Sequence, residues 1–320
     1  MDTKTLLEKI TALPLVTAEL AEGLMAGDLR SIFKGQGMEF NEVRHYLAGD
    51  DIRSIDWNAS ARFGTPYVKM YREERELTVM ILLDISASMH GGSFIRRHTA
   101  RNAPGGVSHG KETESLTPYE QGLIATALIA LSAERTGQRV GACFFDRGIH
   151  RVFPPRKGRR HAMALISRSL QYQNKSLLQK TTEQSSNISA AITAAARMLK
   201  RRSLVVLISD FFSLGWEQHI GDLNSKHDVI ALRISDFMEK DLLDIGLVSI
   251  EDPETRLRIE APTNRYSFRE EWLQWHAERC ELWAGQCRRY GVEYLELSTS
   301  DDAPAVLLKF FGRRQTRERS

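Results

Sequence analysis

Continuous apolar runs alternate with amphipathic stretches from residue 78 onward. Such runs are typical of strands buried on both faces, and the stretches between them place apolar residues at helical spacing. The predicted strands are 79–83, 140–145, 204–209, 229–234 and 292–297, and the predicted helices are 120–135, 158–170, 187–199, 214–226 and 265–290. Parallel strand pairs need crossovers of this length. The pattern therefore predicts an α/β fold, with a doubly wound, mostly parallel sheet flanked by helices.

The segments before and after this pattern have a different character. Residues 4–32 carry apolar side chains at helical spacing on both sides of Pro14, which predicts two short helices. Residues 37–75 contain short, nearly alternating runs separated by turn residues, which predicts strands and turns. We thus expect an N-terminal part at 1–77, a sheet domain at 78–312 and a basic tail at 313–320.

Two insertions interrupt the sheet domain. Residues 90–117 are rich in Gly, Ser, Thr and His without apolar periodicity, which is typical of a long loop. Its histidines lack zinc spacing and are expected to face solvent; they are His90, His98 and His109. Residues 246–262 alternate about a turn at Asp252 and Pro253, which predicts a β-hairpin. Because isolated hairpins are marginally stable, we expect it to share one small antiparallel sheet with 37–75.

Composition narrows the class of protein. The chain has 320 residues, 42% of them hydrophobic and 27% charged, which is enough to bury one large core. No run approaches the roughly 20 apolar residues of a membrane-spanning helix, and no signal-peptide pattern opens the chain. We therefore expect a cytoplasmic protein without a membrane span. The three cysteines lack close metal or redox spacing and are predicted to be buried small hydrophobes.

The charge balance argues against nucleic acid as a partner. The net charge is +3, and basic residues cluster only locally. The basic tail contains one acid and no aromatic side chain on which bases would stack, so it is expected to be a solvated end. Its arginines are Arg313, Arg314, Arg317 and Arg319.

Oxygen-bearing side chains follow two of the predicted strands. Asp84 comes directly after the first strand, and hydroxyls follow at Ser86 and Ser88. Asp210 comes directly after the strand at 204–209. In doubly wound sheets, ligands bind beyond the carboxyl ends of the strands, and hard cations such as Mg²⁺ prefer oxygen ligands. The sequence therefore predicts a divalent-metal site at this edge of the sheet.

A third segment and one alternative bear on this site. The loop Ser185-Ser186-Asn187, which opens the following helix, is a candidate source of a third oxygen ligand. The alternative is that Asp84 and the serines after it only cap a helix, because Asp and Ser are preferred N-cap residues. Placement directly after a buried strand, with a second strand ending in Ser-Asp, favours metal binding.

The same residues resemble a known pattern. Asp-x-Ser-x-Ser, followed by a distant Thr and a distant Asp, is the metal-ion-dependent adhesion site of von Willebrand factor A domains. More narrowly, GMEFNEVRHYLAGDDIRSIDWNASARFGTPYVKMYREERELTVMILLDISASM looks like the signature of the DUF58 family, whose members accompany MoxR-type AAA+ ATPases. The likeness continues through RRSLVVLISDFF, HDVIALRISD and DPETRLRIEAP and covers about residues 35–312.

The resemblance implies a von Willebrand factor A-like fold and a set of metal ligands. The residues that fall on the clustered ligands and the distant acid are Asp84, Ser86, Ser88 and Asp210. The distant Thr has no identical counterpart: either Ser186 or Asn187 stands in that region, and Ser186, which keeps the hydroxyl, enters the ligand set. The implied cofactor is Mg²⁺, or another divalent cation such as Mn²⁺ or Ca²⁺. The loop at 90–117 is longer than the family's usual connection.

Aromatic and charged residues crowd the segment before the sheet. Trp57 and Tyr46 belong either to a small core or to a partner-binding surface, because Trp, Tyr and Arg supply most interface hot spots. Large aromatic side chains are usually well buried. We therefore expect Trp57 to be a core residue and the charges around it to be paired structural supports.

Together these observations predict a protein-binding module that is not an enzyme. The ion would keep one coordination position for a carboxylate of a protein partner. The resemblance implies an adaptor that works with a MoxR-type AAA+ ATPase in chaperone-like assembly or maturation of protein complexes.

The alternative is phosphoryl transfer, with Asp84 as nucleophile and Mg²⁺ as electrophile. Phosphatases of the haloacid dehalogenase type carry a second Asp two residues after the nucleophile, where this chain has Ser86. The chain also lacks a phosphate-binding P-loop and a nucleophile elbow. Both observations disfavour the enzyme.

Overall fold

The computed structural model describes residues 17, 20, 38–47, 50–73, 77–91, 116–175, 186–251 and 258–317. The chain divides into two compact units, residues 30–76 and the remainder. Most of the segment predicted as two helices lies outside the described residues, although Thr17 and Leu20 are helical and buried. Most of the predicted loop at 90–117 and the turn at Asp252 and Pro253 also lie outside them.

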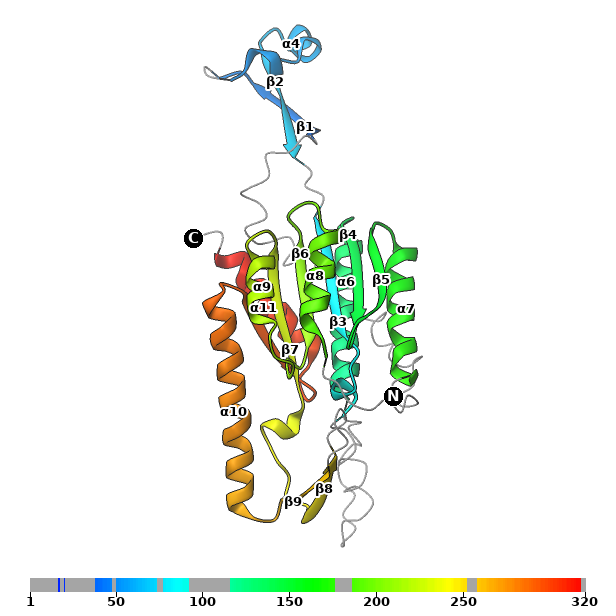
Figure 1. Cartoon of the computed structure of the whole chain (residues 1–320). Coiled ribbons are helices and arrows are strands. Elements are labelled where there is room, and N and C mark those ends of the chain that lie inside the picture. The colour runs from blue at the N-terminus through cyan, green and yellow to red at the C-terminus, as the bar shows by residue number, and fades with distance from the viewer. Residues whose placement is uncertain are drawn as a thin grey trace, which may run out of the picture. The chain divides into compact units, whose positions relative to one another are not determined.

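A six-stranded sheet forms the centre of the larger unit (Figure 1). Its strands are β10 (Glu293–Ser298), β7 (Asp228–Ser235), β6 (Leu204–Ser209), β3 (Thr78–Asp84), β4 (Arg139–Phe145) and β5 (Ile149–Arg156), in this spatial order. All neighbours are parallel except β5, which pairs antiparallel with β4 at the edge. The predicted fold class is confirmed. The order reverses between β3 and β6, the kind of switch point at which doubly wound sheets bind ligands.

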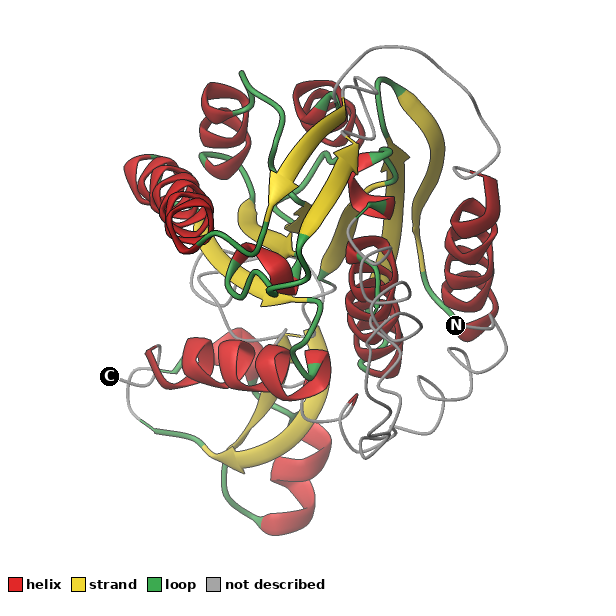
Figure 2. Cartoon of the chain, turned by 90° about the horizontal axis from the view of Figure 1, so that it is seen from below, coloured by secondary structure: helices red, strands yellow, loops and turns green. Residues whose placement is uncertain are grey.

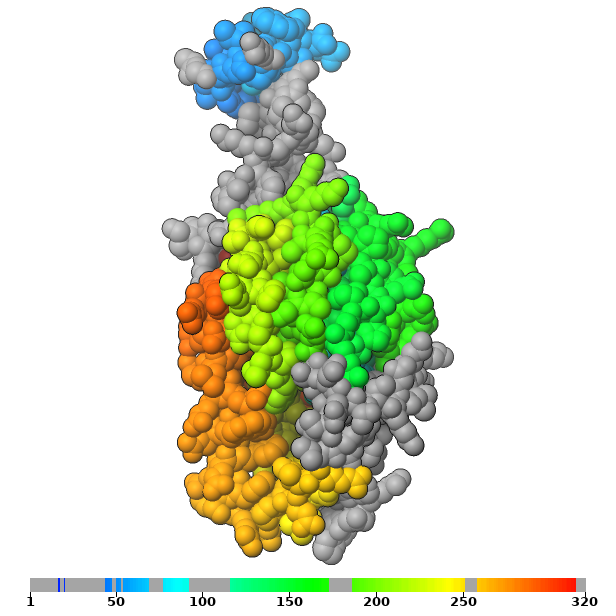
Figure 3. Space-filling view, in the orientation of Figure 1, coloured from blue at the N-terminus to red at the C-terminus, as the bar shows by residue number. Residues whose placement is uncertain are grey.

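Helices cover both faces of the sheet (Figure 2). On one face, α8 (Ile188–Met198), α9 (Glu217–Asn224) and α10 (Tyr266–Arg289) pack on alternate strand residues such as Leu82 and Leu207. Figure 3 shows these three helices on one surface of the molecule. On the other face, α6 (Pro118–Arg135) contacts α7 (Arg159–Lys175) and α11 (Ala303–Arg317). A Cβ at Gly122 of α6 would lie 3.2 Å from Ile208, so this glycine lets the helix approach the strands closely.

In the larger unit, one strand (β5) and one α-helix (α11) escaped prediction. β5 is an edge strand with mostly exposed or half-buried side chains and contains Pro154 and Pro155, so it lacks the continuous apolar run of a central strand. α11 continues through the predicted tail as far as Arg317. Arg314 is buried and pairs with Asp228 (Nη2 to Oδ2, 2.6 Å), so the expectation of a fully solvated tail is wrong. Its long side chain reaches across to the start of β7.

The smaller unit is a hairpin with a short helix. β1 (Met38–His45) and β2 (Tyr67–Glu73) pair antiparallel, and η1 (Ile52–Ser54) and α4 (Trp57–Phe63) lie between them in the chain. Paired charges are confirmed, since Arg44 makes two hydrogen bonds to Asp50, of 2.8 and 2.7 Å. The prediction for Trp57 is wrong: it is 70% exposed, on a seven-residue helix without any buried residue. So small a unit has too little interior to enclose an indole ring.

The predicted hairpin at 246–262 is present as β8 (Leu247–Glu251) and β9 (Arg258–Pro262). It forms its own two-stranded sheet, separate from β1 and β2, so the expected shared sheet is wrong. In the segment before the hairpin, the carbonyl of Met238 in η3 (Phe237–Glu239) accepts a 2.9 Å hydrogen bond from the indole of Trp272 in α10.

The three cysteines were predicted to be buried. Cys143 and Cys287 are buried, and Cys280 is half-buried. In the part of the chain that the structure describes, no helix is both long enough and apolar enough to cross a bilayer.

Candidate metal centre

Asp84 is the last residue of β3, and its carboxylate is completely buried. Oδ1 accepts a 2.9 Å hydrogen bond from the backbone N–H of Ser86. Oδ2 accepts 2.7 Å hydrogen bonds from the hydroxyls of Ser186 and Ser209. Three segments distant in sequence therefore meet at this one side chain.

The end of β4 brings Ser186 to this position. The N–H of Asn187 donates a 2.6 Å hydrogen bond to the carbonyl of Asp146, which follows β4 directly. The Asn187 side chain turns the other way and accepts from the N–H of Ala190 at 2.9 Å, capping α8. Of the two residues that the sequence left open, Ser186 faces Asp84 and Asn187 serves as a helix cap.

The other predicted residues complete the cluster. The hydroxyls of Ser86 and Ser88 are 3.0 Å apart, and Ser88 opens η2 (Ser88–His90). Asp210 is 4% exposed, and its Oδ1 accepts a 3.1 Å hydrogen bond from the N–H of Phe212. Its Oδ2 is buried and has no hydrogen-bond partner among the described residues. The structure thus brings both acids and the predicted serines to one edge of the sheet.

Strained backbone holds Asp210 in place. Phe211 has a φ of 57°, which is rare for a bulky residue outside a turn that requires it. Its ring is buried 5.1 Å from Trp216 and 5.5 Å from Trp283, measured between centroids. Apolar packing therefore stabilises the strained conformation and fixes the direction of the carboxylate beside it.

The electrostatics of the cluster favour a cation. Burial, and after it the charge of Asp210, raise the pKa of Asp84 to about 7, even though hydrogen bonds from Ser86, Ser186 and Ser209 lower it. Burial also raises the pKa of Asp210, while hydrogen bonding from Ser88 and the N–H of Phe212 lowers it. Two neighbouring buried carboxylates are costly without a positive charge between them.

The capping alternative does not account for these contacts. Ala87 occupies the N-cap position of η2 without a side-chain hydrogen bond, and α6 is capped by Thr117 and Glu120. Among the described residues no three His, Cys, Asp or Glu side chains gather as a metal centre. The cluster offers two carboxylates and several hydroxyls instead, a donor set that suits a hard cation.

Comparison with known proteins identifies the family. The model of the family described as "Protein of unknown function DUF58" matches residues 42–281, about three quarters of the chain. The chain belongs to the DUF58 family.

The comparisons also found individual relatives and solved structures. This DUF58 chain is 26% identical over 316 residues to "Uncharacterized protein Rv1480" of Mycobacterium tuberculosis, covering 98% of this chain and 92% of that one. It is similar in structure to BatB from Bacteroides thetaiotaomicron, with a TM-score of 0.41, 14% identity and coverage of 75% and 99%. An aerotolerance-related membrane protein from Bacteroides fragilis carrying multiple mutations to serines gives a TM-score of 0.44, 18% identity and coverage of 76% and 100%.

Sequence reasoning missed one residue of the polar cluster around Asp84. Ser209 is the last residue of β6, and its hydroxyl contacts Asp84. The available signal was the Ser-Asp pair at the end of the strand. Neighbouring residues of a strand point to opposite faces. Because the chain turns after Ser209, however, the side chains of Ser209 and Asp210 both reach the site.

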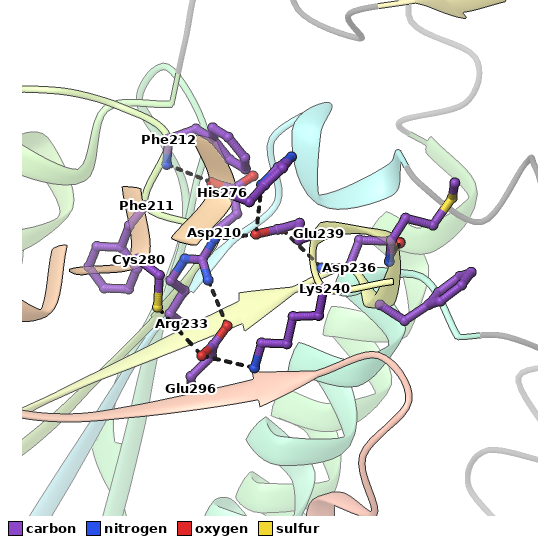
Figure 4. A network of polar contacts seen from close by, with 12 residues as sticks. Asp210, Phe211, Phe212, Arg233, Asp236, Glu239, Lys240, His276, Cys280 and Glu296 are labelled. Atoms are coloured by element: carbon purple, nitrogen blue, oxygen red, sulfur yellow. Dashed lines mark hydrogen bonds and ion pairs between the residues drawn. The ribbon is translucent and has the colours of Figure 1, made fainter. Parts of the chain in front are cut away.

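A buried ion network next to Asp210 was also not predicted (Figure 4). Arg233 of β7 pairs with Glu239 of η3 and, at 2.8 Å, with Glu296 of β10. His276 of α10 lies 3.2 Å from Glu239, measured from Nδ1 to Oε2. The charges of Glu239 and Arg233 both act on the pKa of Asp210, the first raising it and the second lowering it. The network thus couples α10 and η3 to the cluster.

His90 differs from its expected state. Its ring lies 4.3 Å from that of Tyr119, its Nε2 is buried, and burial lowers its pKa to about 4. The expectation that it faces solvent is wrong, because η2 folds it against α6. His98 and His109 lie outside the described residues.

Proposed function

We propose that this DUF58 protein is a non-enzymatic, divalent-metal-dependent protein-binding module. The convergence of Asp84 and Asp210 at the switch point of the sheet carries the proposal. Both carboxylates are buried, and one oxygen of Asp210 has no hydrogen-bond partner among the described residues. A cation there would satisfy that oxygen and offset the repulsion between the acids.

The residues present fit a hard divalent cation, for which Mg²⁺ is the leading candidate and Mn²⁺ and Ca²⁺ are alternatives. The residues that would hold it are Asp84, Ser86, Ser88, Ser186 and Asp210. A bound cation supplies an electrophilic position that accepts an oxygen ligand from outside. We propose that the outside ligand is a carboxylate of a partner protein, which makes partner binding dependent on the metal.

The unit at 30–76 supports a role in a larger assembly. Trp57, at 70% exposed, and Phe63, at 62% exposed, present aromatic surface of the kind that anchors protein interfaces. Together with the DUF58 resemblance, this favours an adaptor that works with a MoxR-type AAA+ ATPase in assembly or maturation of protein complexes. The cytoplasmic location stays a prediction.

The enzymatic alternative has less support. Both oxygens of Asp84 accept hydrogen bonds, and three donors crowd them, which lowers the nucleophilicity of the carboxylate. Ser86 stands where a phosphatase would need a second acid. We therefore assign Asp84 to metal binding rather than to phosphoryl transfer.

Titration calorimetry with MgCl₂ tests the metal site directly. We expect a binding heat for the wild-type protein that is lost in Asp84→Ala and retained in Asp222→Ala, which removes an exposed acid on α9. Affinity capture from lysate of the source cells, with Mg²⁺ or with a chelator, then tests partner binding. Equal recovery of every protein with wild type and Asp84→Ala, in both conditions, would contradict the proposed function.

A further inference from the structure

Arg279 of α10 lies between two aromatic rings beside the candidate metal centre. Its guanidinium carbon is 4.2 Å from the ring centroid of Phe212 and 4.9 Å from that of Trp275. Both distances are well inside the range of cation–π attraction. Such stacking holds the flexible side chain of an arginine in one place and leaves the edge of the guanidinium, with its donors, free to bind.

This arginine differs from its neighbours in its electrostatic partners. In the part of the chain that the structure describes, Arg279 forms no ion pair, whereas Arg233 pairs with Glu239 and Arg288 pairs with Glu281. Arg279 is half-buried rather than fully solvated. A partly desolvated guanidinium without a carboxylate has donors that remain to be satisfied, and carboxylates match their fork geometry.

Phe212 connects Arg279 to the metal centre. Its N–H donates to Oδ1 of Asp210 at 3.1 Å, while its ring carries the guanidinium. Burial lowers the pKa of Arg279, as does the charge of Arg233, while the charges of Glu239 and Asp210 raise it. A ligand that reaches the edge of the sheet at Asp210 therefore comes close to Arg279 as well.

The surroundings of Arg279 have the composition of an interface hot spot. Trp275 is 47% exposed, and Leu214, in the loop that follows Asp210, is 89% exposed. Aromatic residues and arginine dominate the binding energy of protein interfaces, surrounded by apolar contacts that exclude water. Trp275 contributes exposed aromatic surface directly beside the guanidinium of Arg279.

We propose that Arg279, held between Phe212 and Trp275, binds a second acidic side chain on the partner segment whose first carboxylate occupies the metal. The inference rests on the proposed function and specifies the partner: an extended peptide segment with two acidic residues and an apolar residue near them. A cation held by Asp84 and Asp210 would accept an oxygen of one carboxylate. Arg279 takes the other through paired hydrogen bonds, a geometry that lysine does not reproduce.

A 12-residue random peptide library displayed on phage serves as the probe. Selection on the wild-type protein in Mg²⁺ is expected to enrich peptides with two acidic residues. Synthetic versions of these peptides, labelled with a fluorophore, are then titrated by anisotropy against wild type, Arg279→Ala, Arg279→Lys and Asp84→Ala. Arg289→Ala is the matched control, because Arg289 lies on the same helix and also contacts an aromatic ring, that of Tyr290, at 5.8 Å.

We expect Arg279→Ala to weaken peptide binding about tenfold or more, and Arg279→Lys to weaken it several-fold despite its charge. Arg289→Ala should bind as wild type does. Changing one acid of the peptide to its amide should have no further effect in Arg279→Ala, which identifies that acid as the partner of Arg279. Thermal unfolding of each variant shows whether it is folded.

The outcomes separate this inference from the proposed function. Wild-type affinity in both Arg279 variants, with binding still lost in Asp84→Ala, would overturn the role of Arg279 and leave the metal-dependent module in place. Binding that needs Arg279 but survives a chelator and Asp84→Ala would support acid capture by Arg279 and contradict the metal-dependent function. Selection of peptides without acidic residues, or of none, would overturn the inference.

Discussion

The hydroxyl of Ser186 donates a 2.7 Å hydrogen bond to Oδ2 of Asp84, across 102 positions of sequence. The adjacent Asn187 has a separate task, since its side chain caps α8. Two consecutive residues thus have different roles: Ser186 binds Asp84, and Asn187 caps α8.

Substitution separates these two roles. Ser186→Ala should weaken Mg²⁺ binding while α8 stays intact, because it removes a hydroxyl from the cluster without touching the cap. Asn187→Ala should lower the free energy of unfolding by about 1 kcal/mol, through loss of the cap, with Mg²⁺ affinity nearly unchanged. Calorimetric titration and chemical denaturation measure the two effects. Loss of Mg²⁺ binding in Asn187→Ala alone would reverse the assignment.

The metal-free protein should become more stable as the pH falls through about 7. The pKa of Asp84 is raised from 3.8 to about 7 by burial and by Asp210, so the folded state binds a proton more tightly than the unfolded chain. That contribution to stability is fully present below pH about 4 and is lost as the pH rises through about 7. Urea denaturation in chelator, from pH 5 to pH 8, measures it.

Asp84→Asn provides the control for this pH dependence. The amide does not ionise, so the slope of stability against pH over this window should flatten. Saturating Mg²⁺ should also remove the stabilisation by acid, because protons and the cation compete for the same carboxylates. A wild-type slope in the Asn variant would show that other groups cause the effect.

The ion network of Arg233 should be essential for stability. Arg233→Ala leaves Glu239 and Glu296 without their buried counter-charge, and we expect a loss of about 3–5 kcal/mol in the free energy of unfolding. Arg288→Ala, which breaks the exposed pair with Glu281, should change stability little. Equal, small effects in both variants would mean that water replaces Arg233 in the network.

Trp57 should matter for binding and not for folding. Because its ring is 70% exposed, Trp57→Ala should change the free energy of unfolding by no more than about 0.5 kcal/mol. Capture of the MoxR-type ATPase should nevertheless fall, if this ring is an interface anchor. Trp283→Ala, which removes a buried ring from the core, should cost about 3–5 kcal/mol. Undiminished capture by Trp57→Ala would contradict the proposed role of this ring as an anchor for the ATPase.

Local pattern was sufficient for the five parallel strands of the sheet, and insufficient for its edge strand β5 and for the exposure of Trp57 in the small unit. Strands such as β3 and β6 read as continuous apolar runs because both of their faces are buried. Trp57 was predicted to be buried from the average behaviour of its residue type. That average fails in a short segment, where the number of neighbours, and not hydrophobicity, decides exposure.

The candidate site, too, was only partly predictable from local pattern. Asp84 and Asp210 were identifiable because each follows a buried strand, and parallel strands end at the same edge. Ser209 had a signal in the Ser-Asp pair that was not used. The Arg233 network had none, since its residues come from separate strands and helices with no shared spacing in sequence. The choice between Ser186 and Asn187 depended on tertiary contacts: the hydroxyl of Ser186 reaches Asp84, while the side chain of Asn187 caps α8.

The sequence by itself determined the α/β class, the central strands and the two acids at their ends, because periodicity and residue type report burial along one element at a time. Only the tertiary structure decided which hydroxyls reach Asp84, that Phe211 holds Asp210 in a strained turn, and that Arg279 lies beside the cluster without a carboxylate partner among the described residues. These features depend on distances between segments far apart in the chain. Such distances arise from the packing of the whole domain and leave no local pattern behind.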